Sequence, residues 1–193
     1  MLDYITGKIT ELTPASVVIE AGGLGYYASI SLNTYSALNG LTDCKLYVYE
    51  SIREDAHQLF GFIEKREREL FLHLITVSGV GANTARMVLS SITVSDLENV
   101  IASGNSSALK AVKGIGNKTA ERIIIDLKDK IKITGTASGS LPGRTSPLAE
   151  EAVAALAALG FNQAASQKVV ARICGDRPTA KVEEIIKTAL KML

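Results

Sequence analysis

The sequence contains no tryptophan, and aromatic residues make up only 5% of its 193 residues. Proteins that bind single-stranded nucleic acid without sequence preference stack the bases on aromatic side chains. This shortage therefore disfavours a generic single-strand or RNA-binding protein. The sequence also lacks any apolar run of about eighteen residues or more, the length that a membrane-spanning helix needs. We therefore expect no membrane partner.

Cysteine and histidine are scarce as well, with two of each. Cys44 and Cys174 lie in different predicted domains, and neither has the spacing of a metal-ligand set. His57 and His73 each stand apart from any cluster of cysteines or aspartates. The sequence therefore predicts two reduced thiols in a cytoplasmic protein, with no metal or other cofactor. The N-terminus lacks the basic and apolar regions of a signal peptide.

What the chain does contain is a short pattern that occurs twice at an offset of 35 residues, V-S-G-V-G at 77–81 and V-K-G-I-G at 112–116. Each copy follows an apolar stretch and precedes an amphipathic stretch of helical period. This arrangement predicts two units of a helix, a glycine hairpin and a second helix. The apolar Val80 or Ile115 is expected to tuck between the helices. Both glycines of each hairpin are expected to adopt positive φ angles.

Each hairpin would direct the free N–H groups of its second helix outward. A helix N-terminus combines unpaired donors with the positive end of the helix dipole, which makes it an anion site. One such turn is usually only structural, but two matching copies favour binding to a long anion with regular charges, a nucleic-acid backbone. The candidate contacts are Gly79, Val80, Gly81, Gly114, Ile115, Gly116 and Asn117, with the side chains of Arg86, Lys118 and Arg122.

The segment 116–119, G-N-K-T, bears a faint likeness to a nucleotide-binding P-loop. That motif needs a glycine directly before the lysine, another glycine five residues before the lysine, and a preceding strand. Here Asn117 separates Gly116 from Lys118, Lys113 occupies the earlier glycine position, and a helical pattern precedes. The sequence therefore predicts no ATP binding by this chain, and we assign no catalytic residue in it.

Residues 1–63 contain short runs rich in β-branched and aromatic side chains. The expected strands are 4–10, 16–20, 26–31, 45–50 and 58–62. Five short strands in a segment of this length fit a small closed β-barrel of the OB type. Between the last two strands lies a turn with two adjacent carboxylates, Glu54 and Asp55. Taken alone, such a turn is usually only solvated surface.

Residues 64–133 are predicted to form an all-α domain with the tandem helix-hairpin-helix units. A helix connecting the two units is expected at about 95–103, with Ser95 as its N-cap. Charge is distributed unevenly, with a net −4 over residues 1–63, +3 over residues 64–134 and +2 over residues 135–193. The positive excess of the middle segment coincides with the paired hairpins, where phosphate contacts need it.

Residues 134–146 lack acidic side chains and are rich in glycine, serine, threonine and proline, which predicts a flexible linker. Three helices are expected beyond it, at 147–158, 163–173 and 180–192, as a three-helix bundle of the UBA type. The segment 147–193 is near the lower size limit for independent folding. It is either a minor appended bundle or a tethered docking module, and the isolating linker favours the docking module.

The predicted fold class of the whole chain, with a β-barrel followed by two helical domains, is thus multidomain α+β.

In this order of a barrel, tandem hairpins, a linker and a three-helix tail, the chain resembles the RuvA family over its whole length. Each matching element alone is unspecific, whereas the combination is specific, and the linker matches least. The matching residues are Arg53-Glu54-Asp55-Ala56 in the barrel, the two glycine hairpins, Lys118-Thr119-Ala120-Glu121-Arg122 after the second hairpin, and Glu151-Ala152-Val153-Ala154-Ala155-Leu156 and Leu159-Gly160-Phe161 in the tail.

The resemblance implies structure-specific, sequence-independent binding of four-way (Holliday) DNA junctions in homologous recombination, DNA repair and the SOS response. Proteins of this family bind the junction as homotetramers, sometimes as two stacked tetramers. They recruit a RuvB-type ATPase for branch migration, and a RuvC-type junction resolvase is a further implied partner. By the same resemblance, Glu54 and Asp55 form an acidic pin near the crossover, and Leu159, Gly160 and Phe161 belong to a partner-binding surface. The alternative is another helix-hairpin-helix repair protein, such as a structure-specific nuclease subunit.

Overall fold

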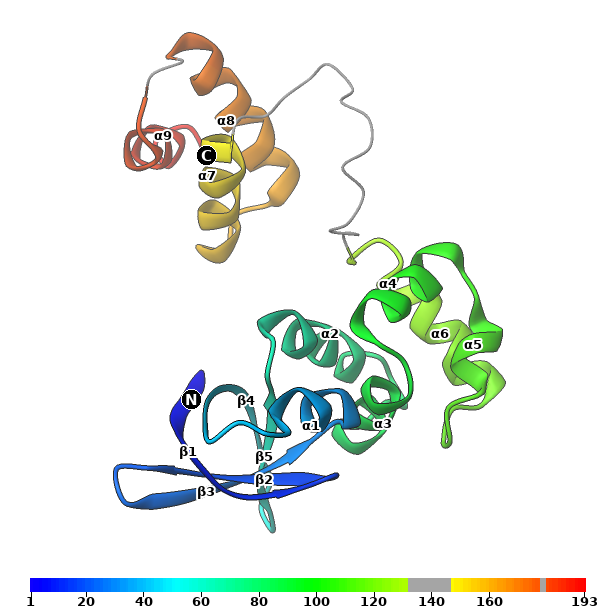
Figure 1. Ribbon diagram of the computed structural model, residues 1–193. Coiled ribbons are helices and arrows are strands. Elements are labelled where there is room, and N and C mark those ends of the chain that lie inside the picture. Colours follow the sequence, from blue (N-terminus) through cyan, green and yellow to red (C-terminus); the bar gives the residue numbers. More distant parts are fainter. Residues whose placement is uncertain (132–146, 178–179) are drawn as a thin grey trace. The chain divides into compact units, whose positions relative to one another are not determined.

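The computed structural model describes residues 1–131, 147–177 and 180–193 (Figure 1). The chain divides into two compact units, Met1–Thr136 and Ala137–Leu193. The first unit contains β1 to β5 and α1 to α6, and the second contains α7 to α9. The predicted linker, residues 134–146, lies outside the described residues.

The first unit begins with the closed five-strand barrel that the sequence predicts. Its strands are β1 (Tyr4–Thr13), β2 (Ser16–Ala21), β3 (Leu24–Ile30), β4 (Asp43–Ile52) and β5 (His57–Phe62). Their order around the barrel is β1-β2-β3-β5-β4. All neighbours are antiparallel except β3 and β5, which pair in parallel and close the barrel. The turn between β4 and β5 carries Glu54 and Asp55.

The barrel interior follows the two-residue period of its strands. Val17 and Ile19 of β2, and Leu46 and Val48 of β4, are almost fully buried. A short helix between β3 and β4, α1 (Leu32–Leu38), adds its last residue to the same core. The sequence pattern does not predict this helix, because seven residues are too few to show a helical period.

The described chain continues with α2 (Lys65–Ile75), α3 (Ala82–Ser91), α4 (Val94–Ser103), α5 (Ser106–Lys110) and α6 (Asn117–Leu127). Helices α2 and α3 flank the first glycine hairpin, and α5 and α6 flank the second, so the tandem helix-hairpin-helix fold is confirmed. Helix α4 connects the two helix-hairpin-helix units within the first compact unit. Its N-cap is Thr93, whose hydroxyl accepts a hydrogen bond from the Asp96 N–H, so the prediction of Ser95 as the cap is wrong.

One side of the barrel packs against the helices in a second hydrophobic core. Phe60 and Phe62 of β5 pack against Phe71 of α2, with ring centroids 5.3 Å and 4.9 Å apart. The same core extends through the helices to Val80 and Ile115 of the two hairpins. Continuous packing therefore holds the barrel and both hairpins in one compact unit.

The second unit is a three-helix bundle with a core of its own. It consists of α7 (Pro147–Ala158), α8 (Gln163–Asp176) and α9 (Val182–Ala189), so the last helix is shorter than predicted. Leu156, Val170 and Ile185 are buried where the three helices meet. Among the helices of the described residues, none is long and apolar enough to cross a membrane.

A carboxylate is buried where α2 meets the barrel. Glu67 is 2% exposed, and both of its oxygens accept hydrogen bonds, one from the hydroxyl of Ser31 and one from that of Thr34 at 2.6 Å. Burial raises the pKa of the Glu67 carboxyl; the two hydrogen bonds lower this pKa in part, and the charge of Glu64 raises it. Because the net shift is upward, the folded protein holds a proton on Glu67 more tightly than the unfolded chain does.

We expect Glu67→Gln to change how stability depends on pH. Because the pKa of Glu67 is higher in the folded protein, its protonation stabilises the fold. This contribution is complete below the ordinary glutamate pKa of 4.5 and is lost as pH rises through the pKa in the folded protein. The neutral variant lacks this loss, so its free energy of unfolding should rise relative to that of the original protein as pH increases above 4.5. Urea denaturation across this range measures the difference. The exposed Glu69→Gln is the control, and a difference for Glu67→Gln that stays flat with pH would contradict the assignment.

Candidate nucleic-acid interface

The two glycine hairpins have the same backbone structure. In each, the residue between the glycines donates its N–H to a carbonyl three residues earlier, Val80 to Val77 at 3.0 Å and Ile115 to Val112 at 3.1 Å. The side chains of Val80 and Ile115 are 5% and 6% exposed and lie in the shared core, as the sequence predicts. Both side chains anchor the hairpins from inside, so only the backbone of these two residues can face a nucleic acid.

The prediction of positive φ is correct for the first glycine of each pair and wrong for the second. Gly79 and Gly114 have φ angles of 90° and 93°. Gly81 and Gly116 have φ angles of −87° and −86°, in extended backbone that any residue can adopt. Their role is different, because they are the N-caps of α3 and α6. A Cβ atom at either position would meet nothing within 4 Å, so the space before each helix is open.

The first turns of α3 and α6 present amide groups toward this open space. A serine or aspartate N-cap would satisfy one of these donors with its side chain, but a glycine cannot. Within the described residues, neither helix has a side-chain cap. The N–H groups of Asn117 and Lys118 therefore lie at the positive end of α6 and, with the matching groups of α3, form two candidate anion sites.

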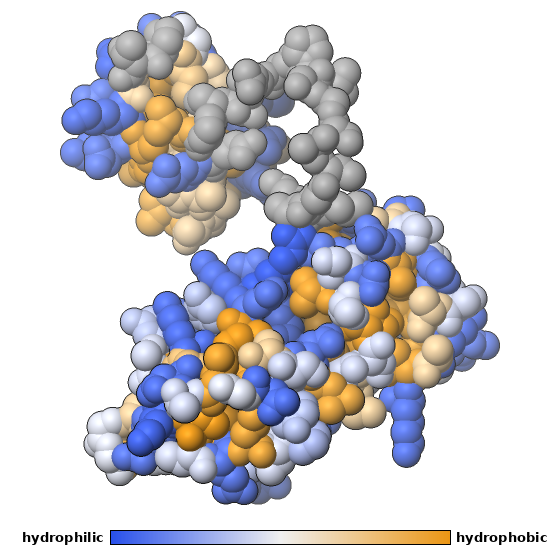
Figure 2. All heavy atoms as spheres, in the orientation of Figure 1, coloured by the Kyte–Doolittle hydropathy of each residue, from blue (hydrophilic) through white to orange (hydrophobic). Residues whose placement is uncertain are grey.

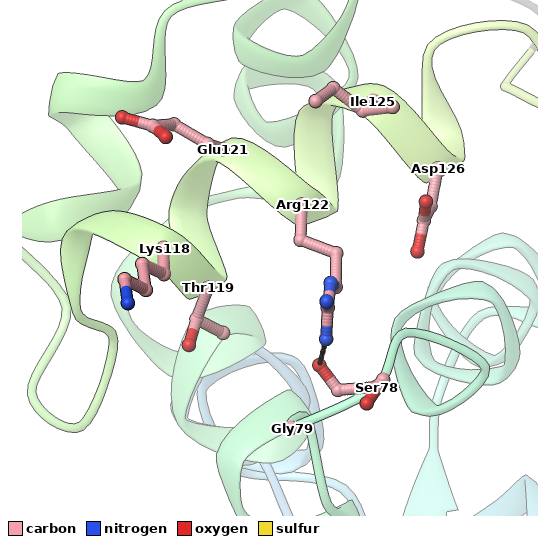
Figure 3. Close-up of a pocket in the computed structure, with 8 residues that line it drawn as sticks. All are labelled: Ser78, Gly79, Lys118, Thr119, Glu121, Arg122, Ile125 and Asp126. Atoms are coloured by element: carbon pink, nitrogen blue, oxygen red, sulfur yellow. Dashed lines mark hydrogen bonds between the residues drawn. The ribbon is translucent and has the colours of Figure 1, made fainter.

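Lys118 and Arg122 lie one turn apart on α6 and line a cavity of about 460 Å³ together with the first hairpin (Figure 3). The Arg122 Nη1 lies 3.5 Å from the carbonyl oxygen of Ser78, so its guanidinium reaches from the second hairpin unit to the first. The remaining lining residues are Gly79, Thr119, Glu121, Ile125 and Asp126. The structure thus brings Gly79, Lys118 and Arg122 together around one opening.

Arg86, in contrast, does not join these residues. Its Nη1 donates to the carbonyl oxygens of Ala15 and Ile30 in the barrel, at 3.3 Å and 3.2 Å. Its Nε is buried and has no hydrogen-bond partner among the described residues. The prediction of Arg86 as a phosphate contact stays a prediction, and the contacts that the structure shows for this guanidinium are with the barrel backbone. The offset of 35 residues pairs Arg86 with Glu121, so the duplication itself argued against this prediction.

The acidic turn lies next to the first hairpin. Arg53 and Ala56 close the turn with a backbone hydrogen bond of 2.8 Å, and Glu54 and Asp55 between them are exposed. A cleft of about 240 Å³ separates this turn from the start of α3. It is lined by Ser51, Arg53, Asp55, Ala56 and Gln58 on one side and Gly81, Ala82, Asn83 and Thr84 on the other. The carboxylate of Asp55 and the free amides of α3 therefore face the same space.

Asn83 and Thr84 are absent from the sequence prediction, although both line this cleft. A signal for them was present in the repeat. The offset of 35 residues pairs Asn83 with Lys118 and Thr84 with Thr119, so each occupies in α3 the place of a residue that lines the cavity beside α6.

The three tail residues of the motif differ in exposure. Leu159 is 61% exposed, whereas Phe161 is half-buried against the core of the three-helix unit. Gly160 has a φ angle of 95°, in the left-handed region that favours glycine, and its N–H donates to Ala157. Gly160 and Phe161 thus shape the turn after α7, and Leu159 is the member of the motif that offers an apolar side chain to solvent.

We expect Gly116→Ser to raise stability slightly while it weakens nucleic-acid binding. Serine is a better N-cap than glycine by about 0.3 kcal/mol, but its hydroxyl would occupy the amides that a phosphate needs. Gly114→Ser should instead cost about 1 to 2 kcal/mol, because its φ is left-handed. Chemical denaturation and DNA titration measure the two effects. Binding by Gly116→Ser that exceeds binding by Lys118→Ala would show that the hairpin is only a turn.

Three family models match this chain, one after another. The model of the RuvA N-terminal domain matches residues 1–61, and that of the SAM-like helix-hairpin-helix tandem matches residues 71–129. The model of the RuvA C-terminal domain matches residues 147–193. These matches correspond to the barrel, the hairpin region and the three-helix unit.

Several relatives are similar over their whole length and over all of this chain. The protein from Azobacteroides pseudotrichonymphae is 59% identical, that from Bacteroides fragilis 55% and that from Porphyromonas gingivalis 46%. Each of the three is named Holliday junction branch migration complex subunit RuvA. With identity at this level over the full length, and with the barrel, the tandem hairpins and the three-helix tail all present, the chain belongs to the RuvA family.

Proposed function

We propose that this chain binds four-way (Holliday) DNA junctions by their shape, and that it serves branch migration in homologous recombination and DNA repair. The observation that carries the proposal is the pair of glycine-capped helix N-termini, held beside an acidic turn in one packed unit. The names of the relatives support the same function, since each is a subunit of a Holliday junction branch migration complex.

Recognition by these groups is independent of base sequence. Backbone amides and the side chains of Lys118 and Arg122 contact phosphates, which position a protein on DNA but carry no sequence information. The barrel has a net charge of −4 and the hairpin region +3, so the barrel surface as a whole repels the duplex. DNA is therefore held at the hairpins, and it approaches the barrel only at the turn that adjoins them.

Glu54 and Asp55 act as an acidic pin at the crossover. They are exposed at the tip of the β4–β5 turn, across a cleft from the amides of α3. Carboxylates repel phosphates, so a duplex lying over the turn loses binding energy. A junction has an opening at its centre that accommodates the pin, and the repulsion then keeps the separated strands apart.

The functional unit is a homotetramer with one junction arm on each subunit. Closed fourfold symmetry matches the symmetry of the ligand and brings four pins to its centre, and a second tetramer can stack on the other face of the junction. Exposed apolar side chains on the first unit supply surface for subunit contacts, among them Leu24, Tyr27, Ile52 and Ile125. Figure 2 shows hydrophobic residues reaching the surface over both the barrel and the hairpin region.

The three-helix unit docks a RuvB-type ATPase, so the chain is a non-catalytic subunit and the ATPase resides on the partner. The exposed Leu159 supports a docking role, because it lies beside a turn whose form Gly160 fixes. A RuvC-type resolvase is a further partner on the junction. Both cysteines are free thiols, in keeping with the reducing cytoplasm in which such a complex would act.

We expect the full-length chain to bind a four-way junction at least about tenfold more tightly than a linear duplex of equal length, which is about 1.4 kcal/mol. Changing the base sequence of the arms should leave the affinity unchanged, and the affinity should fall steeply with salt because phosphate contacts release counterions. Mobility-shift titrations at several salt concentrations measure these quantities. Equal affinity for both DNAs would refute the proposal.

A structure-specific nuclease subunit is the competing function. Among the described residues, no group of three or more histidine, cysteine, aspartate or glutamate side chains is placed to hold a metal ion. Incubation of labelled junctions with the protein and Mg²⁺ or Mn²⁺ separates the two functions. Intact junctions are expected, and metal-dependent cleavage would favour the nuclease.

We expect the double variant Glu54→Gln, Asp55→Asn to bind junctions at least as tightly as the original protein, but to lose preference for them over duplex. Removal of the repulsion between carboxylates and phosphates lets a continuous duplex lie over the turn. The rate of branch migration with a RuvB-type motor should change as well. The control is Glu11→Gln, Glu20→Gln, which removes the same charge from exposed positions of β1 and β2. Unchanged selectivity and rate would mean that the pin is only a solvated turn.

A further inference from the structure

Helix α3 is tied to the barrel at its C-terminal end by α1. The Nδ2 of Asn33 donates to the carbonyl oxygens of Leu89 and Ile92, at 2.6 Å and 3.1 Å. These carbonyls belong to the last turn and the C-cap of α3, where intrahelical partners run out. The N–H of Leu32 donates to the Ser90 hydroxyl at 3.1 Å, which adds a second link at the same place.

The middle of α3 is tied to the barrel by Arg86. Its two hydrogen bonds reach Ala15, before β2, and Ile30, the last residue of β3. Helix α1, which follows β3, is itself held from the other side, because Ser31 and Thr34 donate to the buried Glu67 of α2. We call the side chains of Asn33, Arg86 and Ser90 the α3 clamp. They join α3 to α1 and to the barrel backbone, and α1 is in turn joined to α2 through Glu67.

The N-terminal end of the same helix, which follows the buried Val80, faces the turn that carries the pin. Gly81, Ala82, Asn83 and Thr84 line the cleft whose other wall carries Asp55. A helix of 10 residues is about 15 Å long, so a tilt of about 10° at the clamped end moves its N-terminus by about 2.5 Å. The repulsion between a carboxylate and a phosphate bound at the α3 amides varies inversely with their separation, so a shift of this size changes it.

We propose that the α3 clamp sets the distance between the acidic pin and the first phosphate-binding hairpin, and thereby determines how strongly the protein prefers junctions over duplex. Asn33, Arg86 and Ser90 are thus positioning residues that act through Glu54 and Asp55 without touching DNA. The proposal rests on the proposed junction-binding function and deepens it. It also gives Arg86 a role in place of the phosphate contact that the sequence suggested.

The test variant is Asn33→Asp in the full-length chain. The new carboxylate would face two carbonyl oxygens where a donor is needed, so the end of α3 should shift. The matched control is Asn39→Asp, which adds the same charge at the exposed end of α1, where the backbone N–H rather than the side chain bonds to Tyr35. Ser90→Ala is a milder second variant, which removes the acceptor for the Leu32 N–H and the hydrogen bond that the Ser90 hydroxyl donates to the Arg86 carbonyl, and keeps the side chains of Asn33 and Arg86.

Each variant is combined with the pin change Glu54→Gln, Asp55→Asn, and the ratio of junction to duplex affinity is measured throughout. With the pin intact, Asn33→Asp should lower this ratio by at least about threefold, Ser90→Ala by less and Asn39→Asp not at all. Without the pin, Asn33→Asp should have no further effect on the ratio. The distance between α3 and the turn then no longer matters, because the turn carries no carboxylate to repel a phosphate. Circular dichroism and cooperative unfolding verify the fold of each variant.

The outcomes separate the clamp from the function on which it rests. An equal loss of selectivity with and without the pin would overturn the clamp, since general damage to α3 is additive with pin removal. So would an unchanged ratio in folded Asn33→Asp and Ser90→Ala proteins. If the original protein itself shows no preference for junctions, the proposed function fails and the clamp fails with it.

Discussion

The aromatic contact between the barrel and the helices is the interaction on which the rest of the first unit depends. Phe60 and Phe62 on β5 meet Phe71 on α2, and the same core continues to the hairpin residues Val80 and Ile115. Each such ring pair contributes about 0.5 to 1.5 kcal/mol beyond the area that it buries. Because close-packed cores resist large displacements, this packing keeps the helices against the barrel, and the proposed α3 clamp acts within the position that the packing allows.

Backbone geometry contributes more to the interface than side-chain charge does. The hairpin region carries a net charge of only +3, and one of its predicted contacts, Arg86, is engaged with carbonyl oxygens of the barrel. Besides Lys118 and Arg122, the candidate contacts are two glycine-capped helix ends, whose donors are fixed before any ligand arrives. Fixed donors need no reorganisation on binding, which allows a weakly charged surface to discriminate between DNA shapes by position.

The duplicated pattern was enough to predict the hairpins, and the strand runs were enough to predict the barrel, because both signals are local and periodic. The second glycine of each hairpin was misjudged, since sequence shows that a side chain is absent but does not distinguish a left-handed residue from an open N-cap. The contacts of Arg86 and Asn33 could not be predicted from local sequence for another reason. Their partners, Ala15 and Ile30 for Arg86 and Leu89 for Asn33, lie far away in the sequence.

The two hairpins have the same backbone but different electrostatic surroundings, and this difference gives the proposed complex a direction. The first turn of α6 carries Lys118, and Arg122 follows one turn later, whereas Asn83 takes the place of Lys118 in α3. The cavity at α6 also contains Glu121 and Asp126, and the cleft at α3 contains Arg53 as well as Asp55, so each opening carries as many acidic as basic side chains. The difference lies in the first turn of each helix, where α6 has Lys118 and α3 has the neutral Asn83, so we expect a phosphate to be held more firmly at the second hairpin. We therefore expect the weaker hold next to the proposed pin, where DNA strands would part and move during branch migration.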